Sequence, residues 1–384
     1  MKKIFFMLGV VVFLFVTLAH LRLSSRQPSL FSSSLIESRR NHGCVVDKVG
    51  EREMAILVGG RWASSVETLD LETLQHRLVI PHDPLLDINH IAVEMVPSLK
   101  DPTVQEVWVM CGFHGDNVNR ETTLDHLVIV DSSDWTVKRG PRMDRPRGAC
   151  TSIQLDGPSS GDFDSSLAGF EQADHSQWIK GRLVCAIGGF FGQHDDGQSL
   201  DRFSCYDRLQ RRWLQLPSLP SPLDHHNSVH VKGGTCPDQP RDIVLVFNGR
   251  SGPYNKTIPL IHQLILGESS WQTWEQPFPT PTGAAAASLS STGKIFAFGG
   301  IEYTHGYKKP FRSDQISILD VCTRLSCQAR SSLARVKWAI FPCQASSSDQ
   351  VTICGGASPD HEKNRNHKHC ETFDLSKIEA ECFK

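Results

Sequence analysis

Lys294–Gly300, KIFAFGG, is a short apolar run that ends in two glycines. An apolar run of this length, bounded by a turn signal, is typical of a buried β-strand. Five other segments repeat the pattern, and in two of them Cys111 or Asn248 replaces the first glycine. Successive final glycines are 52, 77, 60, 51 and 56 residues apart, so the chain contains six repeats. The repeat glycines are Gly59, Gly60, Gly112, Gly188, Gly189, Gly249, Gly299, Gly300, Gly355 and Gly356.

Each repeat carries further strands around its glycine segment. An apolar segment precedes it, as in NSVHVK (227–232), and another follows a loop and often closes on aspartate, as in FSCYD (203–207). Trp135, Trp213 and Trp274 lie a few residues later, where we expect a fourth strand to begin. A four-stranded repeat of this kind buries its faces only against neighbouring repeats, so the pattern predicts a closed ring.

Glycine pairs suit the second strand of such a ring for two physical reasons. A side chain there would clash with the adjacent blade, near the crowded centre of the ring. The loop that leaves the strand also needs a positive φ, which glycine adopts without steric cost. Asparagine, present as Asn248, is among the few other residues that tolerate this conformation.

The six repeats resemble those of the kelch family of β-propellers, which includes galactose oxidase, over residues 43–384. A period of about 50 residues is typical of kelch repeats. The resemblance implies an all-β, six-bladed kelch-type β-propeller. The chain departs from the family pattern because only Tyr206 supplies the tyrosine common in kelch motifs, and three repeats lack the tryptophan. We expect GCVVDKV (43–49) to begin blade one and IEAECFK (378–384) to end blade six, with no strand shared between the termini.

An apolar segment precedes the propeller. Residues 4–21 form an 18-residue apolar run, interrupted only by Thr17 and His20, and two lysines stand before it. This run is long enough for a transmembrane signal-anchor helix, with residues 1–3 as a short cytosolic tail and 22–42 as a flexible lumenal stem. We therefore expect a single-pass type II protein of the Golgi or endoplasmic reticulum membrane. The alternative is a signal peptide that is cleaved before secretion.

Twelve cysteines without any C-x-x-C pair favour disulfides in an oxidising compartment over a zinc site. Cys44 and Cys382 lie in the two expected end strands, so we predict a disulfide between them; the alternative is two ordinary buried thiols. The sequon that begins at Asn255 predicts N-glycosylation, consistent with entry into the secretory pathway.

In a propeller, the loops between the second and third strands share one face with the loops that join the blades. On this chain these loops are long and rich in functional groups, so we expect them to form a binding face. Its candidate residues are Arg142, Arg145, Arg147, His114, His194, Asp195, His225, His226, Tyr303, His305 and Tyr307.

The composition excludes a nucleic-acid binder driven by charge, because 40 basic and 42 acidic residues give a net charge of −2. We expect no cofactor and no metal: Cys205 and Tyr206 are sequence neighbours in a strand, the wrong relation for a copper-oxidase site, and His367–Cys370 suits only adventitious metal. The preferred hypothesis is a non-catalytic, membrane-anchored lumenal scaffold for a protein or a glycan. The alternative is a carbohydrate-modifying enzyme, epimerase-like, mutarotase-like or oxidase-like, with its site in the central mouth of the propeller. The oligomeric state stays open.

Overall fold

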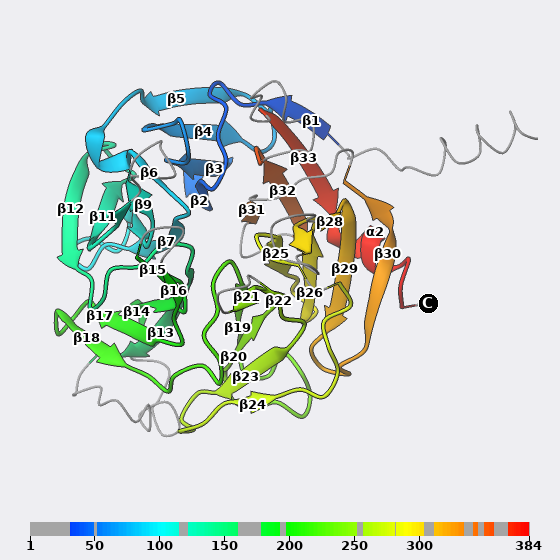
Figure 1. The fold of residues 1–384 in the computed structure, drawn as a ribbon. Helices are drawn as coiled ribbons and strands as arrows, with labels where there is room; N and C mark the ends of the chain where they lie inside the picture. The colour runs from blue at the N-terminus through cyan, green and yellow to red at the C-terminus, as the bar shows by residue number, and fades with distance from the viewer. Residues whose placement is uncertain are drawn as a thin grey trace, which may run out of the picture.

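A computed structural model describes residues 31–49, 52–114, 122–159, 178–192, 197–251, 256–280, 282–302, 311–333, 341–344, 349–356 and 368–383. These residues form six four-stranded antiparallel sheets arranged side by side around a common centre (Figure 1). The innermost strands contact one another in a closed cyclic order. The all-β, six-bladed propeller is therefore confirmed.

From the centre outwards, blade one contains β2 (Gly43–Val49), β3 (Arg52–Val58), β4 (Val66–Asp70) and β5 (His76–Ile80), and blade two contains β7 (Ala92–Pro97), β8 (Gln105–Met110), β11 (His126–Asp131) and β12 (Val137–Arg142). Blade three contains β13 (Thr151–Pro158), β14 (Trp178–Ile187), β17 (Phe203–Asp207) and β18 (Arg212–Gln215), and blade four contains β19 (Asn227–Val231), β20 (Ile243–Phe247), β23 (Ile261–Ile265) and β24 (Gln272–Thr273). Blade five contains β25 (Ala286–Leu289), β26 (Lys294–Phe298), β29 (Gln315–Asp320) and β30 (Ser326–Ser332), and blade six contains β31 (Phe341–Gln344), β32 (Gln350–Cys354), β33 (His369–Asp374) and β1 (Phe31–Ser34).

The hydrophobic core consists of layers between adjacent blades. In β3, Ile56 and Val58 pack toward blade two, whereas Ala55 and Leu57 pack toward blade six. Successive residues of a strand face opposite sides of its sheet, so a sheet covered on both faces needs apolar residues at every position. This requirement explains the continuous apolar runs that end in the repeat glycines.

The glycine pairs have the positive φ angles and the close contacts that the sequence predicts. All ten repeat glycines have positive φ, as do the two substitutes, Cys111 (φ 60°) and Asn248 (φ 61°). A Cβ atom on Gly60 would lie 2.7 Å from His42 Cβ, and one on Gly249 would lie 2.6 Å from His226 Cβ. Each of these glycines therefore leaves space for a side chain next to the innermost strand of a blade.

The aspartates that close the third strands organise hairpin turns. Asp70 Oδ1 accepts hydrogen bonds from the amides of Glu72 (3.0 Å) and Thr73 (2.8 Å). Asp207 and Asp320 accept from the amides two and three positions later in the same way. The repeated aspartate is thus a turn residue on the face opposite the long loops, and not a binding group.

The ring closes differently from the prediction. β1 pairs antiparallel with β33, from Phe31 opposite Thr372 to Ser34 opposite His369, and so supplies the outermost strand of blade six (Figure 1). The propeller therefore begins at Phe31 rather than at 43, and part of the predicted stem belongs to it. The predicted final strand is wrong as well: α2 (Leu375–Glu379) is a short helix, because Asp374 caps its N-terminus and its apolar residues recur at helical spacing.

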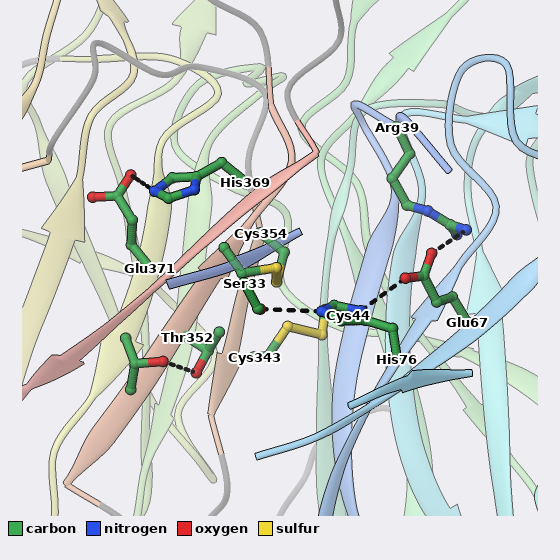
Figure 2. Close-up of a disulfide and its surroundings, with 12 residues drawn as sticks. Ser33, Arg39, Cys44, Glu67, His76, Cys343, Thr352, Cys354, His369 and Glu371 are labelled. Carbon is green, nitrogen blue, oxygen red and sulfur yellow. Dashed lines mark hydrogen bonds and ion pairs between the residues drawn. A yellow bond between two sulfur atoms is a disulfide. The ribbon is translucent and has the colours of Figure 1, made fainter. Parts of the chain in front are cut away.

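The predicted disulfide between Cys44 and Cys382 is also wrong. Cys44 of β2 bonds to Cys343 of β31, which joins the innermost strands of blades one and six (Figure 2). Cys382 instead bonds to Cys327 of β30, because the chain after α2 packs on blade five. The other pairs are Cys111–Cys150, Cys185–Cys205, Cys236–Cys322 and Cys354–Cys370.

All twelve cysteines are therefore paired, and six disulfides are consistent with an extracellular or lumenal protein. The predicted anchor, residues 4–21, lies outside the described residues. Among the residues that are described, no helix is long and apolar enough to cross a membrane.

Hydrogen bonds reinforce the junction between β1 and blade one. His76 of β5 connects Ser33 of β1 with Glu67: its Nε2 lies 3.0 Å from Ser33 Oγ and its Nδ1 lies 2.8 Å from Glu67 Oε1 (Figure 2). Glu67 also accepts from the amide of Ile36 (2.8 Å) and from the buried guanidinium of Arg39 (3.3 Å). The segment after β1 is therefore held to blade one by several charge-assisted contacts.

Candidate functional site

Five residues that precede the innermost strands of blades one to five form a hydrogen-bonded series around the centre of the long-loop face. The amide of each donates to the carbonyl of the one before: His90 to Asn41 (2.9 Å), Ala149 to His90 (3.0 Å), His225 to Ala149 (3.0 Å) and Ala284 to His225 (2.9 Å). All five have φ between 50° and 56°. We call these five residues the mouth ring. The residues that precede β31 in blade six lie outside the described residues.

The mouth ring surrounds a cavity of about 220 Å³, the mouth cavity. A second cavity, of about 710 Å³, lies toward the opposite face. Cys44, Val93, Glu94 and Ala287 line both cavities, so the two cavities adjoin. We call the two cavities together the central channel, and these four shared residues its waist. Polar groups from blades two, three and four reach the mouth cavity, including those of His90, Thr151, Ser152 and Ser228.

His225 is held by a buried ion pair. Its Nδ1 lies 2.6 Å from Asp224 Oδ1 and 2.7 Å from Arg250 Nη2. Asp224 is buried, and accepts from Arg250 Nε (2.9 Å), Arg250 Nη2 (2.7 Å) and Ser199 Oγ (2.6 Å). Burial by itself would raise the pKa of Asp224, but Arg250 and His225 outweigh it and hold the pKa below its ordinary value. A permanent carboxylate therefore orients the imidazole at the mouth.

His90 lies next to His225. Their rings meet edge to face, with centroids 5.2 Å apart, and Phe113 packs edge-on against His90 at 5.5 Å. His90 Nε2 lies 2.8 Å from Asn41 Nδ2. Asn41, His90 and His225 therefore form a continuous row of hydrogen-bonding side chains along one side of the mouth.

Glu94 is an acidic group at the waist of the channel. Burial raises its pKa to about 7, while the Ser152 hydroxyl opposes the shift. Because this pKa lies near neutral pH, Glu94 is able both to accept and to donate a proton to a molecule in the channel.

Two predicted binding residues instead have buried, structural positions. Arg147 has an exposure of 0%, and its guanidinium donates to the carbonyls of Ala186, Gly188 and Arg202 and to Asp144. The prediction of Arg147 as a surface contact is therefore wrong, because its charge satisfies the carbonyls beside a glycine pair.

His226 is buried between blades three and four. Its Nε2 lies 2.9 Å from Thr151 Oγ1, and its side chain packs against the glycine pairs of both blades. Burial lowers the pKa of His226 to about 3, so the ring is neutral. His226 lines the mouth cavity, but its main role is to pack between the two blades, because its side chain is buried.

The remaining candidates do not converge. Arg142 pairs with Asp125 at 3.5 Å, and its side chain is 82% exposed. Arg145 lies over the ring of Phe191 at 4.8 Å, and His114 stacks with His126. These three arginine and histidine candidates lie around the rim, whereas His225 and His226 line the mouth cavity. Five predicted binding residues and the sequon asparagine lie outside the described residues: His194, Asp195, Tyr303, His305, Tyr307 and Asn255.

Sequence reasoning missed Asn41, His90, Glu94, Asp224 and Arg250. A signal was present, because RRNHG, INHI and LDHHN each place polar residues just before an innermost strand. Within the described parts of the chain, no group of three or more histidine, cysteine, aspartate or glutamate side chains is arranged to hold a metal ion.

A scan against protein-family models finds no match. The kelch-like protein terF of Aspergillus terreus (strain NIH 2624 / FGSC A1156) is 30% identical to this chain over 108 residues, which are 28% of this chain and 21% of that protein. The match therefore spans about a fifth of the length of the curated relative. The solved structure of YjhT superposes with a TM-score of 0.62 at 10% identity, over 88% of this chain and 94% of that one, and this likeness shows the fold alone. The six observed blades and the likeness to YjhT show a β-propeller, and 108 residues of it are similar to part of a kelch-like protein.

Proposed function

We propose that this protein is a binding propeller of the secretory lumen or the cell exterior, and that a sugar unit of a glycan occupies its mouth cavity. The observation that carries this proposal is the convergence of Asn41, His90 and His225 with the hydroxyl-bearing residues Thr151, Ser152 and Ser228 on one small cavity. A sugar offers hydroxyl groups that both donate and accept, as these side chains do.

The size of the cavity favours a small polar ligand over a protein segment. Its volume of about 220 Å³ is below the roughly 300–1,000 Å³ of sites for drug-sized ligands. The six disulfides support a location in the secretory lumen or outside the cell. In this proposal, residues 4–21 anchor the chain in a Golgi or endoplasmic reticulum membrane, and the propeller faces the lumen.

Saturation-transfer NMR with a panel of monosaccharides tests this function, using the propeller (residues 31–384) prepared with its disulfides formed. We expect at least one pyranose to receive saturation from the protein and to compete with a larger glycan that contains it. Absence of transfer to every sugar, combined with stable capture of a lumenal protein, would instead favour a protein-binding scaffold.

A second candidate is a carbohydrate-modifying enzyme, favoured by one specific observation. Glu94, with a pKa of about 7, and His225, oriented by Asp224, line the same cavity, and such pairs of groups serve acid–base chemistry. NMR of each sugar that binds, followed over hours for the appearance of a new isomer or product, tests this candidate. Glu94→Gln should abolish turnover and leave binding in place; turnover that survives the substitution would exclude Glu94 as the proton-transfer group.

A further inference from the structure

Glu94 places a carboxyl group in the mouth cavity without a basic partner among the described residues. It is the one acidic residue in the described lining of this cavity, and that lining contains no lysine or arginine. Burial and the Ser152 hydroxyl set the pKa of Glu94, and no charged side chain of the described chain contributes to it. The side chain is only partly buried and lines both cavities, so a ligand in the channel has access to it.

The other ionisable groups that line the mouth cavity are three histidines. His226 is neutral, because burial lowers its pKa to about 3. His225 lies against Asp224, which pairs with Arg250, and the ring of His90 packs edge to face on that of His225. Asp224 and Arg250 are absent from the described lining, and their opposite charges offset each other. In the described lining, therefore, no lysine or arginine supplies a permanent positive charge opposite the carboxylate.

The lysines of the channel belong to its lower cavity. Lys48 and Lys180 line that cavity together with Asp47, and none of these three residues lines the mouth cavity. Both lysines are exposed, and neither contributes to the pKa of Glu94. A cation that enters from the long-loop face therefore meets Glu94 without displacing an existing ion pair.

We propose that the sugar unit in the mouth cavity is an amino sugar whose protonated amine pairs with the Glu94 carboxylate. This inference rests on the proposed glycan-binding function and adds the chemical class of the sugar. An ammonium group has three N–H donors and no acceptor. The carboxylate accepts a charge-assisted hydrogen bond from it, and the hydroxyl oxygens of Ser152 and Ser228 are further acceptors in the same lining.

The energetic reason is that Glu94 is ionised at a cost in the empty cavity. Burial disfavours its charged form, which is why its pKa lies above the ordinary value. A bound ammonium group compensates the charge, whereas a neutral sugar leaves it without a partner. Because a hydrogen bond to a charged group contributes about 1.5–3 kcal/mol, an amino sugar should bind about tenfold more tightly than its neutral counterpart, or better.

Ligand-observed NMR titration tests this on the propeller (residues 31–384) with its disulfides formed. The probes are glucosamine, galactosamine and mannosamine, each compared with its parent hexose and with its N-acetyl derivative, which keeps the nitrogen but removes the charge. Phosphate buffer at pH 7 and one fixed ionic strength is used, because an amine buffer would compete. We expect at least one hexosamine to bind about tenfold more tightly than both of its neutral partners.

Two substitutions separate Glu94 from the general charge of the channel. Glu94→Gln keeps the shape of the side chain and removes its charge, so it should lower the affinity for the hexosamine to that for its parent hexose. Asp47→Asn is the matched control, since it makes the same chemical change in the lower cavity alone. This control should keep the preference of the wild type.

Three results would overturn the inference. If the wild-type protein binds every neutral sugar as tightly as its hexosamine, the amino sugar is wrong and sugar binding in the mouth stands. If Glu94→Gln keeps the preference, or Asp47→Asn loses it to the same extent, Glu94 does not pair with the amine. If the wild-type protein binds none of these sugars, the proposed function fails together with the inference.

Discussion

The amide of His225 donates a 3.0 Å hydrogen bond to the carbonyl of Ala149, and so joins blade four to blade three at the mouth of the channel. The same bond recurs between each successive pair of the five described mouth-ring residues. Because these backbones bond to one another, their side chains are fixed relative to a common centre. The propeller thus places side chains from blades that are distant in sequence around one small cavity.

The disulfide between Cys44 and Cys343 should stabilise ring closure more than a disulfide within a blade does. Its loop spans 299 residues, whereas the loop of Cys185–Cys205 spans 20. In the chain-entropy model, the double Cys→Ser variant of the first pair should lose about 6 kcal/mol of unfolding free energy, and that of the second about 3 kcal/mol. Denaturant unfolding measures both. A larger loss from the Cys185–Cys205 variant would contradict this account of ring closure.

Removal of β1 should destabilise the propeller and expose a strand edge. β1 covers β33, and unpaired outer strands are templates for aggregation. We expect a chain that starts at Leu35 to have a lower Tm, and to form oligomers on size-exclusion chromatography. A chain that starts at Gln27 keeps β1 and is the control. Equal Tm values and equal elution of the two chains would show that β1 does not stabilise the ring.

Glu94 should make stability fall as pH rises from about 5 to 8. Its folded pKa of about 7 exceeds the 4.5 of an ordinary glutamate, so over this interval the folded state binds more protons than the unfolded state. At pH 8 we expect Glu94→Gln to have a free energy of unfolding about 1–3 kcal/mol higher than that of the wild type, and at pH 5 nearly the same one. The gain is no larger because Glu94 is only partly buried and keeps contact with the channel. Glu72→Gln, at an exposed turn position, is the control and should show no such pH-dependent gain. A gain for Glu94→Gln that is independent of pH would be inconsistent with this titration.

Asp224→Asn should be strongly destabilising. The buried carboxylate pairs with Arg250, and loss of one member of a buried pair costs about 3–5 kcal/mol. The same chemical change at Asp125, a half-exposed carboxylate that lies 2.9 Å from His126 Nδ1 and 3.5 Å from exposed Arg142, should cost less than about 1 kcal/mol. Urea unfolding at pH 7 compares the two variants. Similar small losses in both would mean that Asp224 does not order the mouth.

Because the folded pKa of Asp224 is held below its ordinary value, the ionised carboxylate stabilises the folded state at neutral pH. The difference in stability between the wild type and Asp224→Asn should therefore shrink as pH falls below about 4. A difference that stays constant down to acid pH would contradict the assignment of Asp224 as a carboxylate.

The repeats were predictable from sequence because a glycine pair solves the same steric problem six times. Strand β1 was not, since its sequence, FSSS, carries no apolar pattern and its pairing with β33 joins residues more than 330 positions apart. The helix α2 could have been predicted, because Asp374 is an N-cap residue and Leu375 and Ile378 recur at helical spacing.

The candidate site was only partly predictable. Glu94 is the one polar residue in the segment AVEMVP, and only the assembled ring shows that its side chain lines the channel. The positive φ of His90 and of His225 is likewise a property of the folded backbone that their residue types do not reveal. Arg147 was misassigned because a buried arginine that caps carbonyls looks the same in sequence as an exposed one.

Occupation of the mouth cavity by a sugar is tested most directly by calorimetric titration of the best-bound monosaccharide against the wild type and Ser228→Trp. Ser228 lines the mouth cavity, so an indole there should fill it; Lys180→Trp, which adds an indole to the lower cavity, is the control. The account predicts one site per chain in the wild type and in Lys180→Trp, and no measurable binding by Ser228→Trp at an unchanged Tm. Equal binding by wild type and Ser228→Trp would contradict it.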